Sequence, residues 1–180
     1  MIKCIDCKLK KLDMFKNMPA LEELYVQNNL ISTLIGIEGV PNLKKINLRH
    51  NKMEKFEEEG LPALDSLQYL NLRTNAVASL AEVFRLFETY KSINDLNLIN
   101  CPVEKEYSSM NILVAEVLAK NGVLNKPGLV RFCKITINDK HKLESVYLSK
   151  YKWAKQEEVR KAEEEKRKAE EAAAAGQDEG

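Results

Sequence analysis

The sequence has few of the residues on which most enzymes and disulfide-stabilised proteins depend. Among 180 residues there are 4 cysteines, 2 histidines and 1 tryptophan. Four cysteines are too few for a disulfide scaffold, so we expect reduced thiols. Two histidines leave little general-base capacity near neutral pH, and no nucleophile elbow or phosphate-binding glycine loop occurs. We therefore predict no catalytic residues.

Neither charge of one sign nor a long apolar run stands out. The formal net charge is +1, with 28 Lys and Arg against 27 Asp and Glu. No basic domain marks a nucleic-acid partner, and no segment has the length of a signal peptide core or a membrane span. We expect an intracellular protein that contacts neither a membrane nor nucleic acid directly.

The dominant feature is a repeated pattern of apolar residues and asparagine. In Leu67 to Val77, apolar residues at 67, 70, 72 and 77 surround Asn75 in the spacing L-x-x-L-x-L-x-x-N-x-L, the signature of a leucine-rich repeat. The same frame places Asn or Cys at 7, 29, 51, 75 and 101, so that the periods are 22, 22, 24 and 26 residues. Five windows in register predict a stack of coils.

Each coil is predicted to begin with a short strand. Leu70 and Leu72 alternate as strand residues do, so both should point into the core, and Asn75 should bond backbone groups where the chain turns away. Residues 79–90 carry apolar side chains at helical spacing. Ser79 and Glu82 have the spacing of a capping box, so we predict a helix on the convex side there.

These patterns predict an α/β leucine-rich repeat solenoid with a parallel concave sheet, short convex helices and a long charged C-terminal helix. The expected divisions are repeats at 1–104, a C-terminal cap at 105–142, a charged helix at 143–175 and a disordered end at 176–180. The first repeat is incomplete, so we expect either that a partner covers this end of the stack or that the 180 residues belong to a longer polypeptide.

Two short motifs have structural explanations. Cys4 and Cys7 have the C-x-x-C spacing of zinc and redox sites, but a zinc site needs two further ligands, no second pair exists, and the repeat frame accounts for both cysteines. Gly36-Ile-Glu-Gly39 resembles an RNA-clamping loop, but the helix and sheet pattern of such folds is absent, so we interpret it as a turn between repeats. We predict no metal and no cofactor.

The main candidate for function is the concave face of the sheet. Aromatic and cationic side chains of the kind enriched in protein interfaces gather at its centre. The residues predicted to contact a partner protein are Tyr25, Gln27, Lys45, Asn47, Arg49, Tyr69, Asn71, Arg73 and Asn97. The alternative is that a solvated sheet face carries polar residues in any case.

A second candidate lies at the start of the charged helix. Tyr147, Tyr151 and Trp153 form a short apolar stripe before a segment of Glu, Lys, Arg and Ala, and we predict that this stripe docks the helix on a partner. The alternative is a solvated tail without a partner.

Three stretches carry a family resemblance. Residues 36–43 (Gly-Ile-Glu-Gly-Val-Pro-Asn-Leu) resemble the 22-residue class of intracellular leucine-rich repeat proteins. Within that class, residues 66–80 and 98–108 resemble a family of radial-spoke proteins of motile cilia. The resemblance implies a non-catalytic scaffold subunit of the axoneme, in the cytoplasmic cytoskeleton, whose partners are neighbouring radial-spoke subunits. Two alternatives remain: a leucine-rich repeat subunit of a nuclear ribonucleoprotein, and a phosphatase regulatory subunit.

Overall fold

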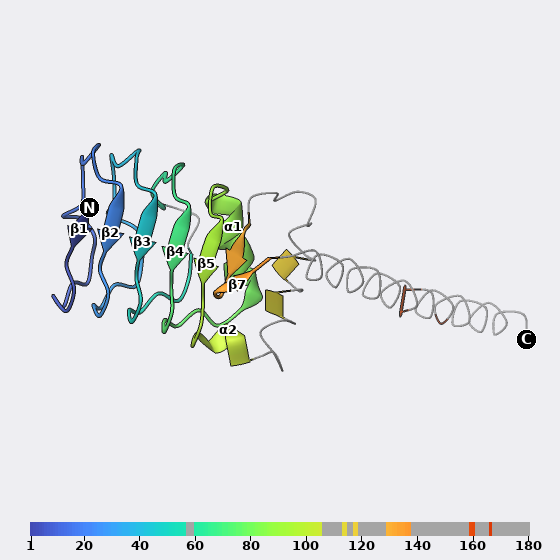
Figure 1. Ribbon diagram of the computed structural model, residues 1–180. Coiled ribbons are helices and arrows are strands. Elements are labelled where there is room, and N and C mark those ends of the chain that lie inside the picture. Colours follow the sequence, from blue (N-terminus) through green and yellow to red (C-terminus); the bar gives the residue numbers. More distant parts are fainter. Residues whose placement is uncertain are drawn as a thin grey trace, which may run out of the picture.

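A computed structural model shows how the repeats stack (Figure 1). It describes residues 1–56, 60–105, 113–114, 117–118, 129–137, 159–160 and 166. Within these residues the strands form one sheet in chain order, β1-β2-β3-β4-β5-β6-β7, and neighbouring strands are parallel as far as β6. The strands are β1 (Ile2–Lys3), β2 (Glu23–Tyr25), β3 (Lys45–Asn47), β4 (Tyr69–Asn71), β5 (Asp95–Asn97), β6 (Arg131–Phe132) and β7 (Ile135–Thr136).

The register of the sheet stacks one inward side chain per coil. Leu24 pairs with Ile46, Ile46 with Leu70, and Leu70 with Leu96. All four side chains have no exposed surface. Leu48 and Leu72, two residues further along their coils, are equally buried, which confirms the prediction that the alternating leucines point inward. The solenoid fold predicted from the period is therefore confirmed.

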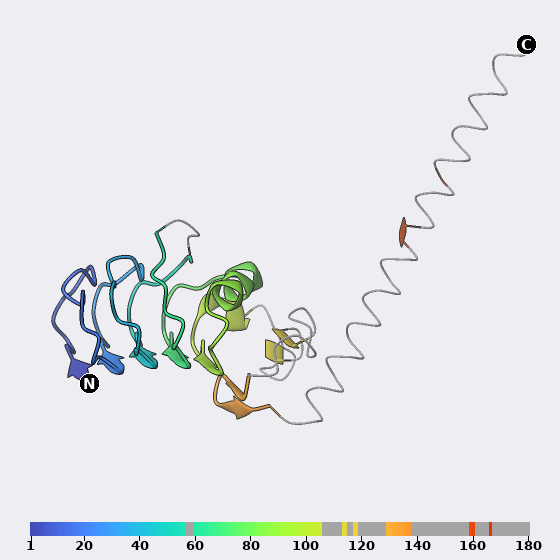
Figure 2. The same cartoon turned by 90° about the horizontal axis from the view of Figure 1, so that it is seen from above.

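The loops and the one long described helix lie on the opposite side of the stack from the strands (Figure 2). This helix, α1 (Leu80–Thr89), buries Val83, Phe84, Leu86 and Phe87 against the core. A shorter helix, α2 (Pro102–Lys105), follows β5. Strands line the inner curve of leucine-rich repeat solenoids, so we name the strand side the concave face.

The prediction of a capping box at the start of α1 is wrong. Ser79 occupies the N-cap position, but its side chain makes no capping hydrogen bond. Glu82 instead accepts a bond from the backbone N–H of Phe56 at 2.9 Å, and its other oxygen accepts one from Arg85 at 2.8 Å. Glu82 thus connects α1 to the preceding coil. The Phe56 N–H and Arg85 occupy the carboxylate oxygens that, in a capping box, would accept a bond from the backbone at the start of the helix.

Inward asparagines join each coil to the one before it. Asn51 donates from Nδ2 to the carbonyl of Val26 at 2.9 Å and to that of Leu48 at 3.0 Å, and its Oδ1 accepts from the N–H of Ile31 at 3.0 Å. Asn29 and Asn75 repeat this arrangement in their own coils. The carboxamide therefore pairs with one backbone N–H and with backbone carbonyls. These groups would otherwise be unpaired in the interior, where the chain turns.

Cysteine takes the same position in the last regular coil. Cys101 is fully buried, and its thiol donates to the carbonyl of Leu72 at 3.1 Å, in place of one of the asparagine bonds. Beyond it, the end of the stack is closed by β6 and β7, which pair antiparallel. Phe132 lies beside Leu96 and is fully buried. Phe132 therefore continues the series of inward side chains beyond Leu96.

A left-handed backbone residue precedes the Asn or Cys position of every coil. Asn28, His50, Thr74 and Asn100 have φ values of 55°, 55°, 56° and 62°. Asparagine tolerates this conformation, whereas a β-branched residue such as threonine is strained in it. Thr74 also has a buried Oγ1 without a hydrogen-bond partner among the described residues. Thr74 is therefore the position at which the repeat geometry fits its residue least well.

Replacing Thr74 with Asn, the residue found at positions 28 and 100, should stabilise the stack. Relief of the strained backbone is expected to raise the free energy of unfolding by about 1 kcal/mol, which corresponds to roughly 2–4 °C in Tm. Thermal unfolding followed by circular dichroism measures this shift. Thr136→Asn is the matched control, because Thr136 is exposed in β7 and has no positive φ. A Tm that falls in Thr74→Asn would contradict the account.

The predicted C-terminal segments are mostly outside the described residues. This applies to the helix at 143–175, the disordered end at 176–180 and the docking residues Tyr147, Tyr151 and Trp153. In the predicted cap at 105–142, the described residues Leu113, Val114, Val117, Leu118 and Leu129 are buried in the core, whereas Val130 is exposed.

Candidate protein-binding surface

The concave face carries three rows of outward side chains, one residue per coil. Strand register defines the first two rows, and inter-coil backbone bonds beyond the strands define the third. The first row is Glu23, Lys45, Tyr69, Asp95 and Arg131; the second is Lys3, Tyr25, Asn47, Asn71 and Asn97; the third is Ile5, Gln27, Arg49, Arg73 and Ile99.

The first row neutralises its own charges. Lys45 Nζ lies 2.9 Å from Glu23 Oε1, and the hydroxyl of Tyr25 donates to Glu23 Oε2 at 3.1 Å. The bond from Lys45 is the main cause that lowers the pKa of Glu23, and the same bond raises the pKa of Lys45. Lys45 and Tyr25, two residues of the predicted centre, are thus brought together around a carboxylate of the same face.

A second ion pair lies at the other end of this row. Arg131 Nε lies 3.5 Å from Asp95 Oδ2, and strand register places the two residues side by side. Burial raises the pKa of Asp95, and the nearby Arg131 guanidinium partly opposes that shift. Tyr69 lies in register between Lys45 and Asp95, where its ring is half-buried. The first row therefore presents to a partner an aromatic ring that lies between two ion pairs, in each of which the charges cancel.

The second row directs its asparagines back to the chain. Asn71 Oδ1 accepts from the N–H of Arg73 at 3.0 Å, and Asn47 does the same for Arg49 at 3.2 Å. Asn97 repeats the bond further along the sheet and is 4% exposed. Asparagine commonly bonds the backbone two residues on. In this structure the bond fixes the backbone of the third row, so Asn47 and Asn71 support the two arginines and Asn97 supports Ile99.

The third row holds two arginines without an ion pair among the described residues. Arg49 is exposed and Arg73 is half-buried, and neither makes an ion pair with a carboxylate of the described residues. Arg73 Nε and Gln27 Oε1 are buried atoms without hydrogen-bond partners in that part of the chain. The structure thus brings Gln27, Arg49 and Arg73 together as an unsatisfied polar strip.

Sequence reasoning did not include three charged residues of this face among its candidates. Glu23 and Asp95 point outward in their strands, and the 22-residue offset between Glu23 and Lys45 was the available signal for their pairing. Arg131 follows Val103, where the period is lost, so its place beside Asp95 required the structure. The spacing Leu129-x-x-Phe132 matches the first part of the repeat frame, and this match is the sequence signal for a further strand at Arg131.

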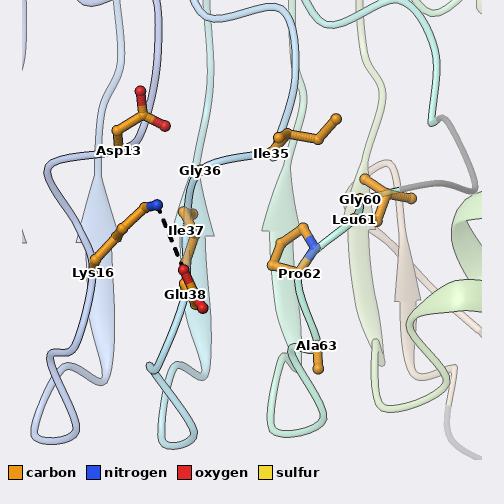
Figure 3. Close-up of a pocket in the computed structure, with 10 residues that line it drawn as sticks. All are labelled: Asp13, Lys16, Ile35, Gly36, Ile37, Glu38, Gly60, Leu61, Pro62 and Ala63. Carbon is orange, nitrogen blue, oxygen red and sulfur yellow. Dashed lines mark ion pairs between the residues drawn. The ribbon is translucent and has the colours of Figure 1, made fainter.

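A shallow hollow of about 430 Å³ lies on the loop side of the stack (Figure 3). Lys16 and Glu38, which pair at 3.5 Å, line it together with Ile35 and Pro62. The backbone of Gly36 has a φ of +107°, and an added Cβ would lie 3.0 Å from the backbone nitrogen of Asp13. Gly36 therefore lies in a tight turn, in which the N–H of Ile37 donates to the carbonyl of Leu34 at 3.4 Å, and Glu38 after it forms a parallel bridge with Lys16.

The cysteines differ sharply in environment. Cys7 is exposed, and Cys4 is half-buried. Burial raises the pKa of the Cys101 thiol and raises that of Cys133 to about 12. No cluster of three or more histidine, cysteine or acidic residues suited to a metal occurs among the described residues. The structure therefore places two thiols in the core and leaves the C-x-x-C pair near the surface.

Alkylation should reveal this difference directly. Because only the thiolate reacts, iodoacetamide at mildly alkaline pH is expected to modify Cys7 quickly and to leave Cys101 and Cys133 unmodified until the chain unfolds. Mass spectrometry of the peptides, with and without guanidinium chloride, measures the extent at each site. Equal modification of Cys7 and Cys133 in the folded protein would contradict the burial described.

No helix among the described residues has the length and apolar content needed to cross a bilayer. Parallel strands in chain order, an inward asparagine ladder and convex loops define a leucine-rich repeat solenoid. The Leucine rich repeat family model matches residues 36–77 of this solenoid. The fold is that of a protein-interaction scaffold.

The curated relatives are similar over part of the chain. Leucine-rich repeat-containing protein 23 of Xenopus tropicalis is 46% identical over 57 residues, which are 32% of this chain and 16% of the relative. Acidic leucine-rich nuclear phosphoprotein 32 family member A of Drosophila pseudoobscura pseudoobscura is 39% identical over 84 residues, which are 45% of this chain and 30% of the relative. The matched segments thus span well under half of either relative.

Among solved structures, a chain of the Drosophila melanogaster SNF/U2A' complex is similar with a TM-score of 0.59. The match covers 82% of this chain and 83% of that chain at 16% identity. At this identity the similarity shows the fold.

Proposed function

We propose that this chain is a non-catalytic scaffold subunit that binds a partner protein on its concave face. The observation that carries the proposal is the polar strip formed by Gln27, Arg49 and Arg73. It is held rigid by inter-coil backbone bonds and contains buried polar atoms without partners among the described residues. Buried donors and acceptors are normally paired, so an added protein surface that pairs them gains stability. Tyr69, in the first row of the same face, adds a half-buried aromatic anchor.

We further propose that the assembly is a radial spoke of the ciliary axoneme. The support is the similarity to leucine-rich repeat-containing protein 23, at 46% identity over 57 residues, together with the resemblance of residues 66–80 and 98–108 to radial-spoke proteins. Neighbouring spoke subunits would then be the partners, and the charged tail with Tyr147, Tyr151 and Trp153 would dock on one of them.

A nuclear complex is the second candidate. The similarity to acidic leucine-rich nuclear phosphoprotein 32 family member A, over 84 residues, favours it. A phosphatase regulatory subunit is a further alternative. Fractionation of cells that express the tagged chain separates the three. Retention in salt-extracted axonemes supports the spoke, whereas recovery with nuclear RNA particles, or with phosphatase activity, would contradict it.

The concave face is tested by replacing Tyr69 and Arg73 with Ala, singly and together. Both side chains are outward, so the fold should persist, and the double variant is expected to lose at least tenfold in partner capture. Co-precipitation with quantitative mass spectrometry measures capture, and circular dichroism confirms folding. Lys16→Ala with Glu38→Ala is the control, because this exposed pair lies on the loop side (Figure 3). Unchanged capture by the double variant would move the interface to another surface.

A further inference from the structure

The third row of the concave face is a straight series of side chains from five successive coils. Inter-coil bonds fix each step: the N–H of Asn28 donates to the carbonyl of Arg49 at 3.0 Å, and that of His50 to Arg73 at 2.9 Å. The N–H of Thr74 continues the series, donating to Ile99 at 2.9 Å. Neighbouring side chains of the row are therefore one strand spacing apart, about 4.8 Å.

The positive charge at the centre of this row has no carboxylate near it among the described residues of the concave face. Glu23 and Asp95 belong to the first row, four residues earlier in their coils, which is about 13 Å along an extended chain. Both acids are also paired already, with Lys45 and Arg131. Arg49 and Arg73 thus remain uncompensated, although Arg73 is half-buried and its Nε has no acceptor among the described residues.

A carboxylate is the group best suited to pair with these two guanidinium groups. The guanidinium presents its donors in a planar fork that matches carboxylate geometry, and a charge-assisted bond is stronger than a neutral one. The asparagines before each arginine hold the backbone in place, so little order has to be gained on binding. Gln27 Oε1, the unpartnered acceptor beside Arg49, adds a position for an N–H donor.

The two ends of the row are apolar. Ile5 is 42% exposed, and Ile99 is half-buried against the core. The row therefore begins with an apolar side chain, continues with one amide and two cations, and ends with a second apolar side chain. Its length is about 19 Å. Residues one turn apart on a helix are separated by about 5–6 Å, close to the coil spacing, whereas same-face residues of a strand are about 6.6 Å apart. A helix laid across the coils matches the row better than a strand.

We propose that the third row receives an amphipathic helix of a protein partner, with two carboxylates one turn apart on Arg49 and Arg73 and apolar side chains on Ile5 and Ile99. This inference rests on the proposed binding role of the concave face. Nucleic acid fits less well, because its continuous phosphates would also meet Glu23 and Asp95, and the chain has a net charge of only +1.

Two synthetic helical peptides test the proposal. Both carry leucine near each end; one has two glutamates a turn apart at its centre, and the other has glutamines there. In a titration of the folded chain followed by ¹⁵N NMR, the glutamate peptide is expected to shift the Nε–H signals of Arg49 and Arg73 and to bind at least tenfold more tightly than the glutamine peptide. Equal binding of the two peptides, or no binding of either, would overturn the proposal.

Matched variants locate the contact. Arg49→Gln with Arg73→Gln should remove the preference for glutamate, whereas Lys52→Gln with Lys55→Gln, which neutralises two exposed lysines outside the row, should leave it intact. Charge reversal to Arg49→Glu with Arg73→Glu should transfer the preference to a peptide with lysines at the centre. Retention of the glutamate preference by the Gln variant would overturn the assignment.

Competition and partner capture distinguish the remaining outcomes. Displacement of the glutamate peptide by oligouridylate at equal concentration would show a nucleic-acid surface and overturn the proposal. If Tyr69→Ala weakens capture of the natural partner while Arg49→Gln with Arg73→Gln does not, the acidic-helix inference fails and the binding role of the face stands. If neither variant weakens capture, the proposed function itself fails.

Discussion

Replacing Asn51 with Ala is expected to lower the free energy of unfolding by about 3 kcal/mol, or roughly 10 °C in Tm. Asn51 is 5% exposed, and its carboxamide bonds the carbonyls of Val26 and Leu48 and the N–H of Ile31. Alanine leaves these backbone groups unpaired in the interior, and each such group costs about 1–3 kcal/mol. Denaturant unfolding followed by circular dichroism measures the loss.

Asn47 provides a control in the same coil. It points to the concave face, is half-buried, and among the described residues its Oδ1 accepts only the N–H of Arg49, at 3.2 Å. Asn47→Ala is therefore expected to cost less than about 1 kcal/mol. Equal losses in the Asn47 and Asn51 variants would show that the ladder of inward asparagines does not join the coils in the way described.

Replacing Leu72 with Asp is expected to prevent the stack from folding. Leu72 has no exposed surface and lies between the coils of Leu48 and Leu98. An aspartate there would bury a carboxylate without a partner, a change that belongs to the group of substitutions costing more than about 4 kcal/mol. Loss of the cooperative thermal transition, and of the protected amides in hydrogen exchange, would register the effect.

Gln68→Asp is the matched control for this substitution. Gln68 is exposed and lies four residues earlier in the same coil, so the same new charge stays in water. Its Tm is expected to remain within about 2 °C of the parent. A Leu72→Asp variant that melts within a few degrees of the parent would contradict the assignment of that side chain to the core.

The fold was predictable because one period governs both the core and the turns. The positions of Leu70, Leu72 and Asn75 in a single window, repeated at 22 to 26 residues, fix which side chains point inward in every coil. Core burial and the asparagine bonds follow from that register and need no information about distant segments. The turn at Gly36 was predictable for the same reason, since it falls between two frames.

Pairing between neighbouring coils was harder to predict. Glu82 has the spacing of a capping residue, yet the N–H of Phe56 and the guanidinium of Arg85 take its oxygens. Lys45 was predicted to contact a partner, and its pairing with Glu23, which register brings beside it, was not foreseen. In both cases the side chain bonds a residue of another coil or of the next helical turn. The role that the local sequence suggests does not take this bond into account.

The outward asparagines show a further limit. Asn71 and Asn97 occupy outward strand positions, which predicts exposed amides, but both are more than nine-tenths buried. Their amide oxygens bond the backbone two residues on, because asparagine is short enough to reach it. Their contact with a partner remains a proposal, whereas their support of Arg73 and Ile99 is seen directly in the structure.

Photo-crosslinking tests the binding role of the concave face most directly. A photoreactive amino acid is placed at Tyr69 on the concave face in one version of the chain and at Ala63, which is exposed at the loop-side hollow, in another (Figure 3). After irradiation of the assembled complex in cells, the chain with the probe at 69 is expected to form a covalent adduct with one dominant partner protein, and the chain with the probe at 63 is not. Adducts from position 63 alone would contradict the account.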